Sequence, residues 1–118
     1  MENRLHPVLS IRIFGSEKCF GPGIAELLRR VDEHHSLRAA ARSMEMAYSK
    51  AWTITKNAER VLGFRLLASA TGGRQGGGAV LTDEARQMLA AYDGYCRRLR
   101  AFGQEAFAEE FSFLDGRI

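Results

Sequence analysis

Hydroxyl and basic side chains recur at helical spacing in the middle of the chain, between Ser36 and Gly63. Residues three and four positions apart lie on one face of an α-helix, so this spacing gathers several hydrogen-bond donors on a single surface. Donors and positive charges on such a surface can contact phosphates and the edges of bases in a nucleic-acid groove. The residues of this face are Ser49, Thr53, Lys56, Asn57 and Arg60, with Lys50 on the flank.

Two helices joined by a tight turn would position these donors. Ser36 is a good N-cap for the first helix, because its hydroxyl can accept a free backbone N–H. The small residues Ala39–Ala41 allow the two helices to cross closely over a turn at Glu45–Ala47. This layout is a helix-turn-helix, whose second helix, beginning near Tyr48, can lie in a DNA major groove. The residues predicted to be buried are Leu37, Ala40, Ala41 and Met44 in the first helix and Ala51, Ile54, Thr55, Ala58, Val61 and Leu62 in the second.

Charge is distributed unevenly along a chain that has the length of one domain. Residues 36–75 hold seven basic and two acidic side chains, whereas residues 83–118 hold five basic and seven acidic ones. A basic middle suits a polyanion partner, although a solvated charged face explains the charge equally well. The sequence has no apolar run of membrane-spanning length and no signal peptide, so we expect a cytoplasmic protein that does not bind membranes. Cys19 and Cys96 are expected to be reduced structural cysteines.

A strand and a helix are predicted before the helix pair. The alternation in Val8–Phe14 predicts a short strand at a sheet edge. Gly15–Gly23 is predicted to be a loop, and Gly23–His34 a helix with Pro22 in its first turn. His34 and His35 have no ligand at metal-binding spacing, and we interpret them as a solvated helix end.

A glycine-rich segment follows the second helix, after the stop signal at Gly63. Thr71–Gly78 contains five glycines in eight residues, and its flanks, Phe64–Ala70 and Ala79–Thr82, are predicted to be strands. A hairpin placed after a helix-turn-helix is called a wing. No Lys-Ser/Thr pair follows the glycines, so a nucleotide-binding P-loop is not expected. The glycines would bring Arg74 and Gln75 close to the DNA backbone or minor groove, and the alternative is a plain flexible loop.

The last predicted helix is long and has an apolar seam. Thr82 caps it, and from Asp83 to Ala106 it would extend about 36 Å. Such a helix is too long to be covered by the short elements before it, so we predict a homodimer; the alternative is an antiparallel return over the first helix. Gly103 is expected to weaken the helix near its end. The seam consists of Ala85, Met88, Tyr92, Tyr95, Leu99, Phe102 and Ala106, of which Met88, Tyr92, Tyr95, Leu99 and Phe102 are assigned to dimerisation.

Two segments resemble a known family. AYSKAWTI (residues 47–54) and ATGGRQGGGAVLT (residues 70–82) are similar to the N-terminal DNA-binding domain of the ModE family, the molybdate-responsive transcription regulators. The segment DEHHSLRAAARSMEMAYSKAW and the pair Leu62-Gly63 also resemble the LysR-type winged helix pattern. The resemblance covers about Gly21–Tyr95 and implies a dimeric winged helix protein that binds DNA. It places Ser49 and Lys50 at the start of the recognition helix and Arg74 in the wing.

ModE-family regulators usually continue into molybdate-binding domains. The sequence ends at Ile118, so we expect a stand-alone DNA-binding module and do not transfer oxyanion sensing to it.

The sequence therefore predicts a mainly α protein with a small β-sheet, a winged helix-turn-helix over residues 1–82 and a dimerisation helix over residues 83–118. The leading hypothesis is sequence-specific binding of double-stranded DNA by a homodimeric transcription regulator, without a cofactor or catalytic residues. The alternatives are a protein-interaction module and a small-ligand or metal sensor in the dimer cleft near the cysteines and histidines. Trp52 is interpreted as core-edge packing. The residues predicted to contact DNA are Arg38, Arg42, Tyr48, Ser49, Lys50, Thr53, Lys56, Arg60, Arg74 and Gln75.

Overall fold

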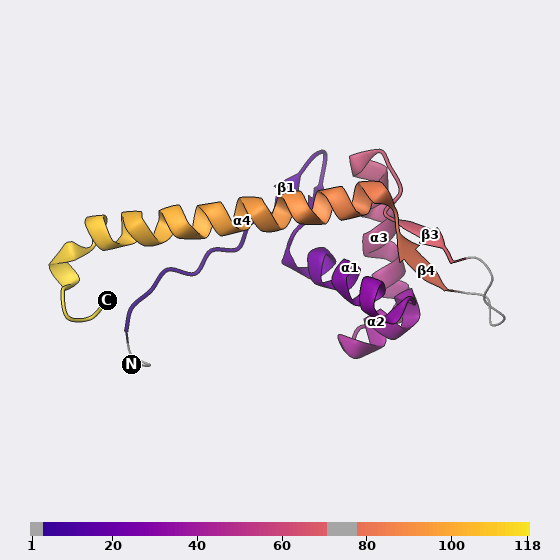
Figure 1. The fold of residues 1–118 in the computed structure, drawn as a ribbon, viewed down its shortest axis with the longest axis horizontal. Coiled ribbons are helices and arrows are strands. Elements are labelled where there is room, and N and C mark those ends of the chain that lie inside the picture. Colours follow the sequence, from indigo (N-terminus) through magenta and orange to yellow (C-terminus); the bar gives the residue numbers. More distant parts are fainter. Residues whose placement is uncertain (1–3, 71–77) are drawn as a thin grey trace.

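Helices α1 (Pro22–His34), α2 (Leu37–Ser43) and α3 (Tyr48–Leu62) form the head of the molecule in the computed structural model, which describes residues 4–70 and 78–118. Figure 1 shows α2 and α3 crossing beside α1, with α4 passing over the head and extending well beyond it. The fold is mainly helical, with small two-stranded sheets and a long C-terminal helix. The predicted winged helix-turn-helix class is confirmed.

Local signals in the sequence account for the ends of these helices. Pro22 occupies the first turn of α1, where its missing N–H costs nothing. The hydroxyl of Ser36 accepts the N–H of Ala39 at 3.0 Å and so caps α2. Gly63 ends α3 in the left-handed region, at φ 86°, and donates its N–H to the carbonyl of Glu59.

The core lies where the three helices meet. Six of the residues predicted to be buried in α2 and α3 are buried, whereas the other four, Met44, Ile54, Val61 and Leu62, are only partly buried. Small residues let α2 and α3 approach closely. The core residues contributed by these helices are Ile24, Ala25, Leu27, Leu28, Val31, Leu37, Ala40, Ala41, Ala51, Thr55 and Ala58.

The predicted first strand was largely wrong. In place of a strand over Val8–Phe14, the structure has β1 at Ile13–Phe14, paired antiparallel with β2 at Lys18–Phe20 inside the predicted loop. Residues before Ile13 follow α4 instead, and the carbonyl of Ile11 accepts a hydrogen bond from Tyr92. Their alternating apolar pattern resembles a strand because an extended segment lying on a helix also turns every second side chain toward its support.

Strands β3 (Leu67–Ser69) and β4 (Ala79–Leu81) pair antiparallel, with Leu67 opposite Leu81 and Ser69 opposite Ala79. They are shorter than predicted, because Leu66 is fully buried in the core and Thr82 caps α4. The glycine-rich tip between the strands, with Arg74 and Gln75, lies outside the described residues.

Helix α4 (Asp83–Glu110) is longer than predicted and continues through Gly103, followed by the short 3₁₀ helix η1 (Ser112–Leu114). A glycine costs a helix only about 1 kcal/mol, and here it makes room for the N-terminal segment. The Cδ1 of Leu9 lies 3.1 Å from where a Cβ on Gly103 would stand. Figure 1 shows this segment running back along α4 toward the C-terminal residues, where the N–H of Leu5 donates to the carbonyl of Arg117 at 2.6 Å.

None of the helices in the described part of the chain is long and apolar enough to span a membrane.

Candidate nucleic-acid interface

The outer face of α3 carries the polar side chains expected of a recognition helix. Ser49 and Thr53 are exposed on the side opposite the buried stripe, and Lys50 is exposed on the flank of the helix. Ala47 precedes the helix without a side-chain cap. The first turn of α3 therefore presents free backbone N–H groups beside exposed donors, an arrangement that attracts anions.

Trp52, interpreted from the sequence as packing at the edge of the core, lies on this outer face of α3. Its side chain is 48% exposed. With Tyr48 and Lys56 it lines a groove of about 230 Å³ between α3 and the wing strands. The Lys56 Nζ stands 5.7 Å from the centre of the indole ring. A signal for this placement was present, because Trp52 follows Ser49 by three residues and precedes Lys56 by four, which puts all three on one helix face.

The basic side chains near α3 divide into two groups. Lys56 pairs with Glu59 at 3.3 Å, and Arg60 pairs with Glu17 at 2.7 Å. In the described residues no ion pair is found for Arg38, Arg42 or Lys50. The guanidinium of Arg38 lies 4.1 Å from the centre of the Tyr48 ring, a cation–π contact that leaves its N–H donors free for another partner.

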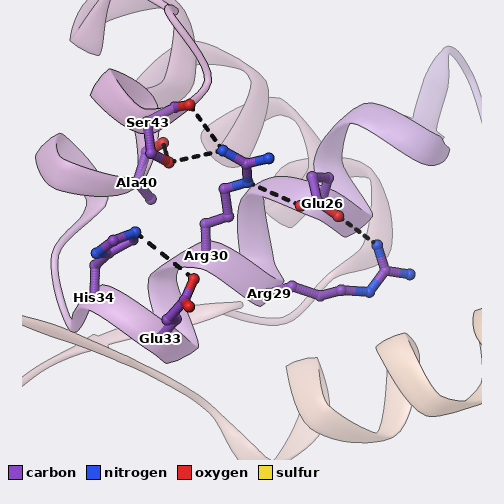
Figure 2. A network of polar contacts seen from close by, with 7 residues as sticks. All are labelled: Glu26, Arg29, Arg30, Glu33, His34, Ala40 and Ser43. Atoms are coloured by element: carbon purple, nitrogen blue, oxygen red, sulfur yellow. Dashed lines mark hydrogen bonds and ion pairs between the residues drawn. The ribbon is translucent and has the colours of Figure 1, made fainter.

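The turn between α2 and α3 is held in place from α1. The Arg30 guanidinium donates to the carbonyl of Ser43 at 2.8 Å and to its hydroxyl at 3.1 Å. Glu26 accepts from Arg30 at 2.8 Å and from Arg29 at 2.9 Å, as Figure 2 shows. The hydrogen bond from Arg30 is the main reason that the pKa of Glu26 is lowered. A cation at the last carbonyl of α2 also suits the negative end of the helix dipole.

In the described residues, three sets of hydrogen bonds fix the base of the wing, two of them to the helical head and one between the two strand ends. The N–H of Ala79 donates to the carbonyl of His35 at 3.0 Å. The hydroxyl of Thr82 donates to the carbonyl of Arg65 at 2.7 Å. The carboxylate of Glu59 accepts the N–H groups of Leu66 and Leu67. This role of Glu59 cannot be predicted from the sequence, because neither its residue type nor its helix position indicates a bond to a strand.

The predicted dimerisation seam is divided by the structure. Tyr92 is only 5% exposed: it stacks edge-on against Phe20 at 5.1 Å and donates to the carbonyl of Ile11 at 2.7 Å. Burial raises its pKa to about 12, so the hydroxyl stays a donor. Tyr92 therefore belongs to the core of its own chain. Tyr95 and Phe102, in contrast, are 54% and 69% exposed, and Met88 and Leu99 are half-buried.

An apolar groove of about 450 Å³ runs beside the exposed part of this seam. It is lined by Ile13 from β1 and by Met88, Ala91, Tyr92 and Tyr95 from α4. Ile13 and Ala91 were absent from the predicted seam. An alanine carries little hydrophobic signal, and the approach of β1 to α4 depends on the tertiary fold.

The histidines and cysteines are the residues of the alternative ligand or metal site. His34 is the last residue of α1, and His35 has left-handed backbone geometry at φ 57°. Cys19 and Cys96 are both free and buried. Across residues 4–70 and 78–118, no group of three or more His, Cys, Asp or Glu side chains is arranged to hold a metal ion.

Comparison with known proteins places this architecture in a family. Residues 25–86, more than half of the chain, match the family described as bacterial regulatory helix-turn-helix protein, lysR family. The chain belongs to this family, and its helix-turn-helix is the DNA-binding domain of a transcriptional regulator family.

Several characterised proteins share this region. The chain is 36% identical over 66 residues to the molybdenum-pterin-binding protein MopB of Rhodobacter capsulatus, covering 56% of this chain and 24% of that protein. It is 32% identical over 72 residues to the transcriptional regulator ModE of Haemophilus influenzae, covering 61% and 28%. It is 30% identical over 94 residues to the molybdenum transport protein ModE of Herbaspirillum seropedicae, covering 78% and 35%. The chain thus spans between a quarter and about a third of the length of these relatives.

Proposed function

We propose that the chain binds double-stranded DNA at specific sequences as a homodimer and thereby regulates transcription. The observation that carries this proposal is the outer face of α3. It presents Ser49, Lys50 and Thr53 to solvent near the guanidinium groups of Arg38 and Arg42, for which the described residues provide no ion pair. A helix of this kind fits the major groove, where exposed donors read base edges and flanking cations hold the phosphates.

The side chains of the interface divide by task. Ser49, Lys50, Thr53 and Lys56 would contact base edges, while Arg38, Arg42 and Arg60 would contact phosphates. The ion pair with Glu17 makes Arg60 the weaker of these phosphate contacts. Tyr48 would donate to a phosphate at the start of α3, and Arg74 and Gln75 would reach the backbone or minor groove from the wing.

We add Trp52 to this set. Its exposed ring faces the groove between α3 and the wing, and its apolar surface suits the methyl group of a thymine.

Dimerisation through α4 is the second part of the proposal. Met88, Tyr95 and Phe102 follow one another at intervals of seven residues, and two of the three side chains are largely exposed. Since a heptad line of apolar residues packs against its like in another helix, a second copy of α4 is the partner we propose. Two copies would also place two recognition helices on one duplex, as dimeric helix-turn-helix proteins do.

The names of several relatives refer to molybdenum. We propose that DNA binding is what this chain shares with them, because the aligned region includes the helix-turn-helix. Molybdenum binding is not part of the proposal.

In-vitro selection from random duplexes, combined with sedimentation equilibrium, tests both parts. We expect enrichment of a two-fold symmetric site and a dimer in solution. Lys50→Ala should lower affinity for the selected site by about 1–3 kcal/mol more than it lowers affinity for random duplexes. Arg97→Ala, an exposed change on α4, is the control. Failure to enrich any site would refute the proposed function.

The exposed aromatic end of α4 favours a second candidate, a protein-interaction module. Phe111 and Phe113 are both exposed there, and an apolar patch of this kind often marks a protein contact. If selection enriched no duplex, this candidate would take the place of the first.

A further inference from the structure

Glu59 is an acidic residue inside the surface that we propose to face DNA. Its carboxylate repels phosphates, and it lies in the last turn of α3, where the helix dipole disfavours a negative charge. Neither DNA attraction nor helix stability explains it. Its side chain is 11% exposed, and a carboxylate so nearly buried requires hydrogen-bond partners.

Those partners are backbone groups of the wing. One carboxylate oxygen, Oε2, accepts the N–H of Leu66 at 2.8 Å and that of Leu67 at 3.3 Å. The other, Oε1, accepts from Lys56 Nζ at 3.3 Å. In the part of the chain that the structure describes, the hydrogen bonds between α3 and the start of β3 all end on this one carboxylate.

This geometry ties two parts of the interface together. Leu67 is the first residue of β3 and pairs with Leu81 of β4, so a bond to its N–H holds the whole two-stranded sheet. The same carboxylate holds the Lys56 ammonium near the Trp52 ring, on the outer face of α3. A shift of Glu59 would therefore move the wing and the lysine together.

We infer that Glu59 is a positioning residue for DNA binding, fixing the wing strands at one angle to α3. This inference rests on the proposed function and names the residue that aligns its two contact surfaces. The benefit is preorganisation: a wing already aligned with α3 loses less conformational freedom when both engage the duplex.

Charge and geometry predict opposite results for Glu59, which makes the inference testable. If Glu59 acted only through its charge, its removal would strengthen binding to the DNA polyanion. If it positions the wing, its removal weakens binding despite the favourable change in charge.

Three variants separate the two effects. Glu59→Asp keeps the charge but shortens the side chain by one methylene, so that it no longer reaches both N–H groups. Glu59→Gln keeps the length, removes the charge and retains one neutral acceptor. The control is Glu84→Gln, which removes an exposed carboxylate near the wing that accepts no hydrogen bond in the described residues.

Affinity for the selected duplex and hydroxyl-radical footprints are measured at a temperature where circular dichroism shows every variant folded. We expect Glu59→Asp to bind about tenfold and Glu59→Gln about threefold more weakly than wild type. Both should lose the outer protections that flank the α3 contacts while keeping the central ones. Glu84→Gln should bind as tightly as wild type or more tightly.

Two results overturn the inference alone: both Glu59 variants binding as tightly as wild type, or protection falling evenly across the whole site. A wild-type chain that selects no duplex refutes the proposed function first, and the inference with it.

Discussion

Salt dependence gives the most direct quantitative test of the proposed interface. Each phosphate that a cation neutralises on duplex DNA adds about 0.9 to the slope of log affinity against log salt concentration. The cations of the interface without an ion pair in the described residues are Arg38, Arg42 and Lys50. Two copies of the chain would bring about six such cations to the duplex, which corresponds to a slope of about −5.

Replacing Arg42 by Gln removes one of these cations from each copy without introducing a charge. The slope should become shallower by about 1.8. Between ~50 and ~200 mM salt, wild-type affinity should fall about a thousandfold and that of Arg42→Gln about a hundredfold. Because Arg42 is assigned to phosphates, the loss of affinity should be the same for selected and random duplexes.

Fluorescence anisotropy of a labelled duplex over a salt series measures this slope. Arg86→Gln is the matched control, since Arg86 lies on α4 and already pairs with Asp32 at 2.9 Å. Equal slopes for wild type and Arg42→Gln would refute the placement of α2 and α3 against the phosphates. So would an equal change in the Arg86→Gln control.

Three further predictions concern dimerisation, packing and pH. Tyr95→Asp places a charge on the exposed seam, so sedimentation should show monomers where wild type dimerises; Gln104→Asp, exposed elsewhere on α4, should leave the dimer intact. Gly15→Ala should lower the free energy of unfolding by roughly 1–3 kcal/mol, because the Cβ of the new alanine would lie 2.6 Å from the Cγ1 of Val61. Gly23→Ala meets no atom within 4 Å and should be neutral or stabilising in urea unfolding. Glu26 has a pKa below its ordinary value of 4.5 in the folded protein, so its ionised carboxylate stabilises the fold above pH 4.5. This stabilisation is lost as the pH falls through the lowered pKa. In Glu26→Gln, the free energy of unfolding measured against pH should not show this loss.

The helix pair could be predicted from the sequence because its signals are local. The serine cap at Ser36, the terminating Gly63 and the 3.6-residue spacing of apolar residues act within one or two turns. The structure places α2 and α3 where these signals do, and it fully buries the centre of the predicted stripe while leaving Met44, Ile54, Val61 and Leu62 partly buried. Assigning hydroxyl and basic side chains to the outer face of α3 then follows from helix geometry alone.

The first strand shows where local pattern is insufficient. Val8–Phe14 alternates as a strand does, yet most of it lies along α4, and the strand that pairs with β1 occupies the predicted loop. Whether an extended segment joins a sheet or lies on a helix depends on which neighbour is nearby. That neighbour is about eighty residues away in sequence, as the bond from Tyr92 to Ile11 illustrates.

The seam of α4 shows the same division between local and tertiary information. Its heptad spacing correctly indicated an apolar face on a long helix. Heptad spacing does not show which residues of that apolar face pack against the core of the same chain and which stay exposed. The structure covers Tyr92 with Phe20 and leaves Tyr95 and Phe102 exposed, because β2 and the N-terminal segment reach only one side of the helix.

The class of fold, the limits of the helix pair and the chemistry of its outer face follow from the amino-acid sequence alone. These properties depend on residues within a few positions of one another. Packing between elements, in contrast, turns Trp52 toward the groove, buries Tyr92 in the core and lets Glu59 join the recognition helix to the wing. Each of these depends on a contact between elements, and burial and hydrogen bonding exist only once those elements have packed together.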